Sequence, residues 1–204
     1  MSGRLKIVLA SASPRRKELM EQLGVPFEVV DPGDVEEAAS GRPEEAVKRN
    51  SLAKAVKVAG VLEEGIVVGA DTVVVKGDRI LGKPGGPAEA KDMLRVLSGS
   101  SHRVLTGITV VDAWTGRVES DVVETLVSML PLSEEDIDRY VASGEPLGKA
   151  GGYAIQELGA VIVKGIDGCF HNVVGLPLSC LNTLLRKFGF NILPQADSPR
   201  EKNL

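Results

Sequence analysis

The fold class is indicated first by the stretch Ile7-Val8-Leu9-Ala10-Ser11-Ala12-Ser13-Pro14-Arg15-Arg16-Lys17-Glu18-Leu19. The four apolar residues at its start predict a short buried strand. Ser13 suits a helix N-cap and Pro14 suits the first helical position, so a helix is expected to follow at once and to stop near Gly24. A tight strand–turn–helix unit of this kind is typical of α/β proteins.

Three cations, Arg15, Arg16 and Lys17, fall in the first turn of this helix. Cations are mildly unfavourable at the positive end of a helix dipole, by about 0.3–1 kcal/mol each when exposed. A bound phosphate would resolve this conflict, because helix-end amides and guanidinium groups both suit that anion. The alternative is a solvated basic turn, and this stretch by itself leaves both readings open.

Strand and helix patterns alternate along the rest of the chain without repeats. The predicted strands are 27–30, 66–75, a short one ending near 81, 103–111, 117–129 and 160–166, and the predicted helices are 43–61, 88–97, 134–142 and 177–188. Hairpins and strand–helix units both occur, which predicts an α/β fold with a mixed sheet. We expect one domain over residues 1–193 and a polar tail over 194–204 that frays.

Composition and charge exclude several classes of function. The formal net charge of −4 over 204 residues argues against a nucleic-acid binder, so the basic turn is a local feature. No apolar run approaches the roughly 20 residues of a membrane span, and the start of the chain has no secretory signal pattern. Cys169 and Cys180 fit neither a disulfide framework nor a metal-site spacing. These features together predict a cytoplasmic protein without a membrane partner.

Asp71 is the residue most out of place, because it interrupts the apolar run from Ile66 to Val75. A buried carboxylate needs a cation, a metal ion or hydrogen-bond donors. Gly69 and Ala70 beside it leave room for a ligand. The alternative is that the strand breaks and Asp71 begins a turn.

Two lysines are weaker candidates. Lys54 shares a helical stripe with Val47, Ser51 and Val58, so it either enters a polar site or extends along the surface to solvent. Lys83 lies in the rigid loop Gly82-Lys83-Pro84-Gly85-Gly86, which could hold a cation against phosphate but lacks the ending of a Walker A loop.

Two further segments carry candidate polar residues. Residues 149–156 are rich in glycine and alanine and include Lys149, Tyr153 and Gln156, and the Gln156 amide could read a base edge. The alternative is a compact turn before a strand. Glu36 and Glu37 belong to an acidic loop, and such loops are usually only solvated.

Taken together, these stretches resemble the Maf family, historically called septum formation inhibitors and later recognised as nucleotide pyrophosphatases. The resemblance runs from about Lys6 to Phe188. It rests on five motifs in the family's order: Ser11-Ala12-Ser13-Pro14-Arg15-Arg16, Gly69-Ala70-Asp71-Thr72-Val73-Val74, Leu81-Gly82-Lys83-Pro84, Lys149-Ala150-Gly151-Gly152-Tyr153-Ala154-Ile155-Gln156 and Val174-Gly175-Leu176-Pro177.

The resemblance implies a mixed sheet flanked by helices, with two lobes around a deep cleft, related to the inosine-triphosphate pyrophosphatases and usually homodimeric. It also implies hydrolysis of nucleoside triphosphates to monophosphate and pyrophosphate with a divalent metal, Mg²⁺ or Mn²⁺. The implied catalytic residue is Asp71, as general base or as metal ligand, and Glu36 is similar to the family's loop glutamate that would share the metal. The implied substrate-binding residues are Ser11, Arg15, Arg16, Lys54, Lys83, Lys149 and Gln156.

The segment ending in Gln156 is similar to the branch of the family that acts on dTTP and UTP. Two positions depart from the usual pattern: Gly148 stands where the family has Asp, and Glu157 stands where it has Gly. The alternatives are a pyrophosphatase for 7-methyl-GTP or other non-standard nucleotides, and a nucleotide-binding regulator of cell division.

Overall fold

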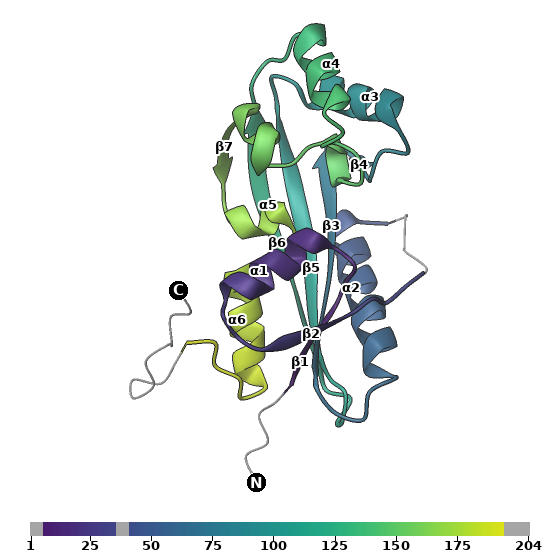
Figure 1. Cartoon of the computed structure of the whole chain (residues 1–204), viewed down its shortest axis with the longest axis vertical. Coiled ribbons are helices and arrows are strands. Elements are labelled where there is room, and N and C mark those ends of the chain that lie inside the picture. Colours follow the sequence, from purple (N-terminus) through teal and green to yellow (C-terminus); the bar gives the residue numbers. More distant parts are fainter. Residues whose placement is uncertain (1–5, 36–40, 194–204) are drawn as a thin grey trace.

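A mixed seven-stranded sheet runs the length of the molecule in the computed structural model, which describes residues 6–35 and 41–193 (Figure 1). Its strands are β1 Ile7–Ala10, β2 Phe27–Val30, β3 Ile66–Lys76, β4 Arg79–Leu81, β5 Ser101–Asp112, β6 Val118–Met129 and β7 Val163–Asp167. Strands β1 and β2 occupy the predicted residues, and the predicted mixed sheet is confirmed.

The strand order is β2-β1-β3-β5-β6-β7, and β4 pairs with β3. Strand β1 is parallel to both of its neighbours, whereas the pairs from β3 to β7 are antiparallel. All four residues of β1 are buried, as expected for a strand that is covered on both faces.

The helices cover both faces of this sheet (Figure 1). Helix α2 lies on one face of the lower half, α1 and α6 lie on the other face, and α3 and α4 cover the upper end. Their bounds are α1 Pro14–Gln22, α2 Pro43–Ala59, α3 Pro87–Leu97, α4 Glu134–Ala142, α5 Phe170–Val174 and α6 Leu178–Lys187.

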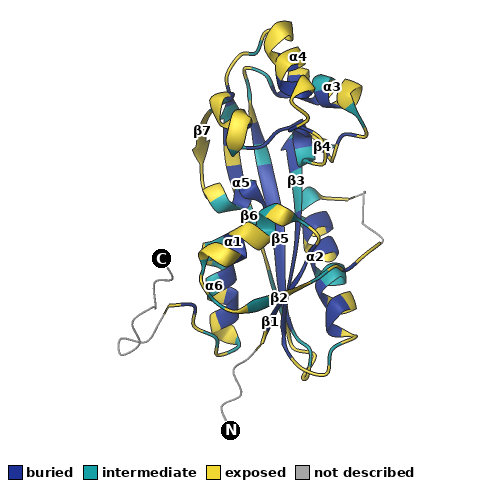
Figure 2. Ribbon diagram, in the orientation of Figure 1, coloured by how far each residue is buried: buried dark blue, intermediate teal, exposed yellow. Residues whose placement is uncertain are grey.

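Buried residues follow the strands and the inner faces of these helices (Figure 2). The lower half has an apolar cluster on each face of the sheet, one under α6 around Leu181 and one under α2 around Val58. A separate cluster around Leu94 and Ile137 packs α3 and α4 against the upper half. The molecule therefore has two lobes that share the long strands β3, β5 and β6.

Helix α2 approaches the sheet closely at two glycines. A Cβ atom on Gly69 would lie 2.4 Å from the Ser51 carbonyl oxygen, and one on Gly107 would lie 2.2 Å from that of Val47. Real Cβ atoms do not come that close to backbone oxygens, so both positions require glycine. This close packing brings the polar side chains of α2 next to the middle of β3.

Two sequence-based expectations were wrong in detail, and one short helix was not expected. Ser13 occupies the N-cap position of α1, but its side chain caps nothing, and its N–H donates to Ser11 Oγ at 3.1 Å. Strand β7 begins at Val163 rather than at Ala160, because a short 3₁₀ helix, η2 Glu157–Val161, precedes it. Helix α5 was not predicted, since five residues are too short for a clear helical period.

The tail predicted to fray, residues 194–204, lies outside the described residues. Among the helices of the described ranges, none combines the length and the apolar content needed to cross a membrane.

Candidate active site

A cavity of about 730 Å³ lies beside the middle of strand β3, where the two lobes meet. Along this edge of β3, pairing with β1 ends at Gly69 and pairing with β4 begins at Val74. Residues 70–73 thus have no strand partner on that edge in the described part of the chain. The gap opens at the carboxyl end of β1, next to the start of α1, a position where α/β proteins commonly bind ligands.

Asp71 lies in this gap and points to the α2 face of the sheet. Its Oδ1 accepts a hydrogen bond from Lys54 Nζ at 2.6 Å, and its Oδ2 accepts one from Asn50 Nδ2 at 3.0 Å. Asp71 is only 7% exposed, so this ion pair offsets much of the cost of burying the carboxylate. Asp71 does not begin a turn, and Lys54 enters the polar site instead of extending to solvent.

Asn50 is a site residue that the sequence analysis did not select. It lines the cavity and precedes Lys54 by four positions, so both side chains project from the same face of α2. The sequence signal that could have identified Asn50 is its position one helical turn before the candidate Lys54.

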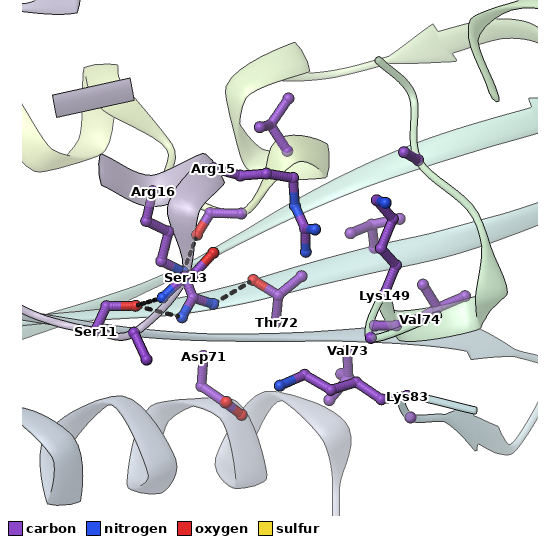
Figure 3. Close-up of a pocket in the computed structure, with 18 of the residues that line it drawn as sticks. Ser11, Ser13, Arg15, Arg16, Asp71, Thr72, Val73, Val74, Lys83 and Lys149 are labelled. Atoms are coloured by element: carbon purple, nitrogen blue, oxygen red, sulfur yellow. Dashed lines mark hydrogen bonds between the residues drawn. The ribbon is translucent and has the colours of Figure 1, made fainter. Parts of the chain in front are cut away.

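Arg16 is held on the opposite face of β3 from Asp71 (Figure 3). Its Nε donates to the Gly175 carbonyl at 2.8 Å, its Nη2 to Thr72 Oγ1 at 3.1 Å and its Nη1 to Ser11 Oγ at 3.5 Å. The acceptors lie in the loop between β1 and α1, in β3 and at the end of α5, and they fix the plane of the guanidinium before any ligand binds.

The orientation of Arg16 depends on a helix that the sequence analysis missed. The buried Asn172 side chain of α5 donates to the Val104 carbonyl and to Thr125 Oγ1, both at 3.0 Å. Its backbone carbonyl accepts from Thr106 Oγ1 at 3.1 Å. Helix α5 is thereby attached to β5 and β6, and Gly175 at its end is placed to receive Arg16.

The other cations approach the cavity from its rim. Within residues 6–35 and 41–193, the side chains of Arg15 and Lys83 form neither a hydrogen bond nor an ion pair, and Lys83 extends from the upper lobe toward Asp71 (Figure 3). Burial lowers the pKa of Arg15, and the carboxylates of Glu157 and Glu18 partly offset that effect. Lys149 Nζ donates to the Glu145 carbonyl at 2.5 Å.

Gln156 lines the cavity from the upper lobe, half-buried, directly before η2. The next residue, Glu157, has φ 53°, and no other non-glycine residue of the described ranges has a positive φ. Glycine adopts this left-handed conformation most easily, so the departure noted in the sequence has a conformational cost.

Glu36, with its neighbour Glu37, lies outside the described residues. No group of three or more His, Cys, Asp or Glu side chains that could hold a metal ion occurs among the residues that the structure places. Asp71 and Asp31 are the carboxylates lining the cavity, and Asp31 Oδ1 already accepts from the Gly33 N–H at 2.8 Å.

The electrostatic character of the cavity is strongly positive. Among the residues that the structure describes, two carboxylates line the cavity against five cationic side chains: Arg15, Arg16, Lys54, Lys83 and Lys149. Such a surface suits a polyanion that carries several phosphate groups. An anionic carboxylate on the floor of the same cavity can bind a metal ion or take a proton from water.

The fold and the site together define an α/β protein with a polyphosphate-binding cleft and one acidic residue at its centre. The chain belongs to the family described as Maf-like protein, whose sequence model matches residues 6–188.

Bacterial relatives match over nearly the whole chain. A protein of Pelotomaculum thermopropionicum named dTTP/UTP pyrophosphatase is 49% identical over 189 residues, which cover 92% of this chain and 99% of that one. Proteins with the same name from Dictyoglomus thermophilum and Ruminiclostridium cellulolyticum are 46% and 47% identical over 191 residues, with 92% and 98% of the two chains covered in each case.

Two solved structures resemble the fold remotely. The Staphylococcus aureus Ham1 protein gives a TM-score of 0.42 at 17% identity and covers 63% of this chain and 72% of that one. A nucleoside-triphosphatase / dITP/XTP pyrophosphatase of Mycobacterium abscessus gives 0.43 at 15% identity, with 90% and 98% covered. At these TM-scores the likeness carries no argument about the site.

Proposed function

We propose that this protein is a nucleoside triphosphate pyrophosphatase that hydrolyses dTTP and UTP to the monophosphate and pyrophosphate. The observation that carries the proposal is the Asp71–Lys54 pair on the floor of a cavity surrounded by cations. In a protein that only bound the metal-free triphosphate, this carboxylate would repel the polyanion and weaken binding. The names of relatives that share nearly half of the sequence over almost the full chain support the same reaction.

In the proposed reaction, water adds across the α–β phosphoanhydride bond and pyrophosphate leaves. Arg16 and Ser11 would bind the triphosphate at the start of α1, with Arg15, Lys83 and Lys149 joining from the rim. Negative charge grows on the leaving pyrophosphate in the transition state. Cations that are already oriented stabilise this charge without reorganising during the reaction.

We propose a divalent cation, Mg²⁺ or Mn²⁺, as the cofactor, because carboxylate and phosphate oxygens are the ligands that such ions prefer. Mg²⁺ in phosphate-transfer sites is usually bound by one or two carboxylates together with substrate phosphates. Asp71 supplies one carboxylate in the cavity, and Glu36 is the residue that the family resemblance suggests as the second. When bound there, the metal ion would supply Lewis-acid polarisation of a phosphate oxygen.

Asp71 would act either as a ligand of that metal ion or as the general base that takes the proton from water. Its two hydrogen bonds, from Lys54 and Asn50, fix the carboxylate orientation for either role.

The test is pyrophosphate release from dTTP, UTP, CTP, ATP, GTP, ITP and 7-methyl-GTP, each with Mg²⁺, with Mn²⁺ and with EDTA. We expect dTTP and UTP to give the highest kcat/KM, and EDTA to abolish turnover. A preference for 7-methyl-GTP or ITP would contradict the base assignment, and release of orthophosphate in place of pyrophosphate would contradict the reaction class.

We also propose, from the family resemblance, that the protein is a cytoplasmic homodimer. Sedimentation equilibrium measures the mass of the assembly, and a mass near the 21.6 kDa of one chain would contradict the dimer.

A further inference from the structure

The segment that presents Gln156 to the cavity has little regular structure of its own. Residues 153–156 lie between the 3₁₀ helices η1 Ala150–Gly152 and η2, and all four line the cavity. A segment of this kind needs other contacts to hold a side chain in one orientation.

These contacts converge on one buried carboxylate, that of Glu145. Its Oε1 accepts hydrogen bonds from the Tyr140 hydroxyl at 2.8 Å and the Gly159 N–H at 2.9 Å, and its Oε2 accepts one from the Leu158 N–H at 3.0 Å. The Tyr140 hydroxyl in turn accepts from the Ala154 N–H at 3.0 Å.

The backbone is therefore held on both sides of Gln156 by hydrogen bonds to the pair formed by Glu145 and Tyr140. Ala154 lies two positions before Gln156, and Leu158 and Gly159 lie two and three positions after it. Helix α4 supplies Tyr140, and Glu145 follows that helix closely, so both anchors rest on the packed upper lobe.

Glu145 is 9% exposed, and its side chain forms no ion pair with any residue in the described ranges. A buried carboxylate without a cation is costly, and here three donors satisfy it. The packing around it is equally close, because a Cβ atom on Gly159 would lie 1.9 Å from the Ala154 carbonyl oxygen and 2.7 Å from the Tyr140 hydroxyl.

We propose that Glu145, acting with Tyr140, is a positioning residue that fixes Gln156 against the nucleobase and thereby sets base selectivity. The inference rests on the proposed function. Neither Glu145 nor Tyr140 lines the cavity, so their side chains act on the substrate through the segment that they hold. The backbone carbonyl of Glu145, which accepts from Lys149 Nζ, is retained in a side-chain variant.

The test compares UTP with ribose 5′-triphosphate, which carries the triphosphate but no base. In Glu145→Gln the amide keeps one acceptor oxygen and turns an NH₂ group toward a backbone donor, so at least one anchor is lost. We expect kcat/KM for UTP to fall about tenfold, mainly through KM, while kcat/KM for ribose 5′-triphosphate stays within twofold. Equal losses on both substrates, or no loss on UTP, would overturn the proposal.

Tyr140→Phe is the second variant. It removes the hydrogen bond from the Ala154 N–H and keeps the hydrogen bonds that the Leu158 and Gly159 N–H groups donate to Glu145. Tyr140→Phe should lower the ratio of kcat/KM for UTP to kcat/KM for ribose 5′-triphosphate, by a smaller factor than Glu145→Gln does. This variant keeps the proposal testable if Glu145→Gln does not fold. The matched control is Glu135→Gln on the solvent side of α4, where Glu135 forms a surface ion pair with Arg139. This control should match the wild type on both substrates.

A double-mutant cycle separates positioning from a general loss of stability. If Glu145 acts through Gln156, Glu145→Gln should cost little on UTP in a Gln156→Ala background. Additive losses would overturn the proposed route. If the wild type prefers another nucleotide to UTP, the base assignment fails and the same comparison with that nucleotide still decides the role of Glu145. A wild type that hydrolyses no triphosphate overturns both proposals.

Discussion

Lys54 Nζ lies 2.6 Å from Asp71 Oδ1, so the buried carboxylate of β3 meets its counter-ion on the helix packed against it. The side chains are 14% and 10% exposed, and both line the cavity. The pair can therefore be reached by a ligand while it is shielded from bulk water, which strengthens its electrostatic interactions.

Asp71→Asn tests the role of this carboxylate. The substitution keeps the size of the side chain and removes its charge, so we expect turnover to fall to nearly zero while circular dichroism shows a native fold. Unfolding should occur at a lower temperature, because the ion pair between Asp71 and Lys54 in a largely buried site is lost. Pyrophosphate release within a few-fold of wild type would remove Asp71 from the mechanism.

Arg16→Ala tests the oriented guanidinium. A hydrogen bond from a charged group is worth about 1.5–3 kcal/mol, which corresponds to a loss of roughly ten- to a hundredfold in kcat/KM. Lys17→Ala is the control, since Lys17 is exposed and its ion pair is with Glu21. Equal kinetics for Arg16→Ala and the control would make the basic turn a surface feature only.

Gln156→Ala tests how the base is read. A glutamine amide offers one donor and one acceptor, as the uracil and thymine edges require. Sites built on such hydrogen bonds discriminate strongly when a partner is missing. The variant should therefore narrow the gap in kcat/KM between UTP and GTP. An equal drop for both nucleotides would show that Gln156 contributes to activity without reading the base.

Glu157→Gly tests the strain at φ 53°. Glycine removes a left-handed penalty of about 1–2 kcal/mol but adds about 0.4–1 kcal/mol of unfolded-state entropy. We expect a net gain in the free energy of unfolding of about 0.5–1 kcal/mol and a rise in Tm of about 1–4 °C. Glu157→Gln keeps the backbone conformation and removes the charge, so a similar gain in that variant would assign the effect to charge.

His102 should make the fold sensitive to acid. Burial, with a smaller contribution from Lys76, lowers its pKa to about 4, below the roughly 6.5 of an unfolded chain. As the pH falls below about 6.5 the unfolded state binds a proton first, so stability is lost progressively down to about pH 4. At pH 5 the loss from this one group is about 1–2 kcal/mol.

Urea unfolding at pH 7.5 and pH 5 measures this effect. The decrease in the free energy of unfolding between the two values should be smaller in His102→Gln than in the wild type by about the amount above. The hydrogen bond between His102 Nε2 and the Tyr153 hydroxyl, 2.7 Å long, is lost at both pH values and cancels in this difference. Identical decreases in the two proteins would exclude His102 as the acid-sensitive group.

Features that depend on residues near each other in the chain could be predicted from the sequence. The strands β1 and β2 and the helix α4 were predicted at the observed residues, because the periodicity of apolar side chains is local. The anomaly at Asp71 was also visible, since a carboxylate within an apolar strand needs a partner wherever the strand lies. The family motifs then indicated which residues gather around it, and the structure places all of them that it describes around one cavity.

Which side chains meet follows from how distant segments of the chain pack together. Arg16 and its acceptor Gly175 are 159 positions apart, and α5, which presents Gly175, is too short to give a periodic signal. Nothing in the sequence distinguished Glu145 from other polar residues, yet its carboxylate accepts hydrogen bonds from the backbone N–H groups of Leu158 and Gly159. These two residues belong to η2, which occupies the first positions that were predicted for β7. Hydrogen bonds of this kind depend on where distant segments pack, and no local pattern in the sequence records that position.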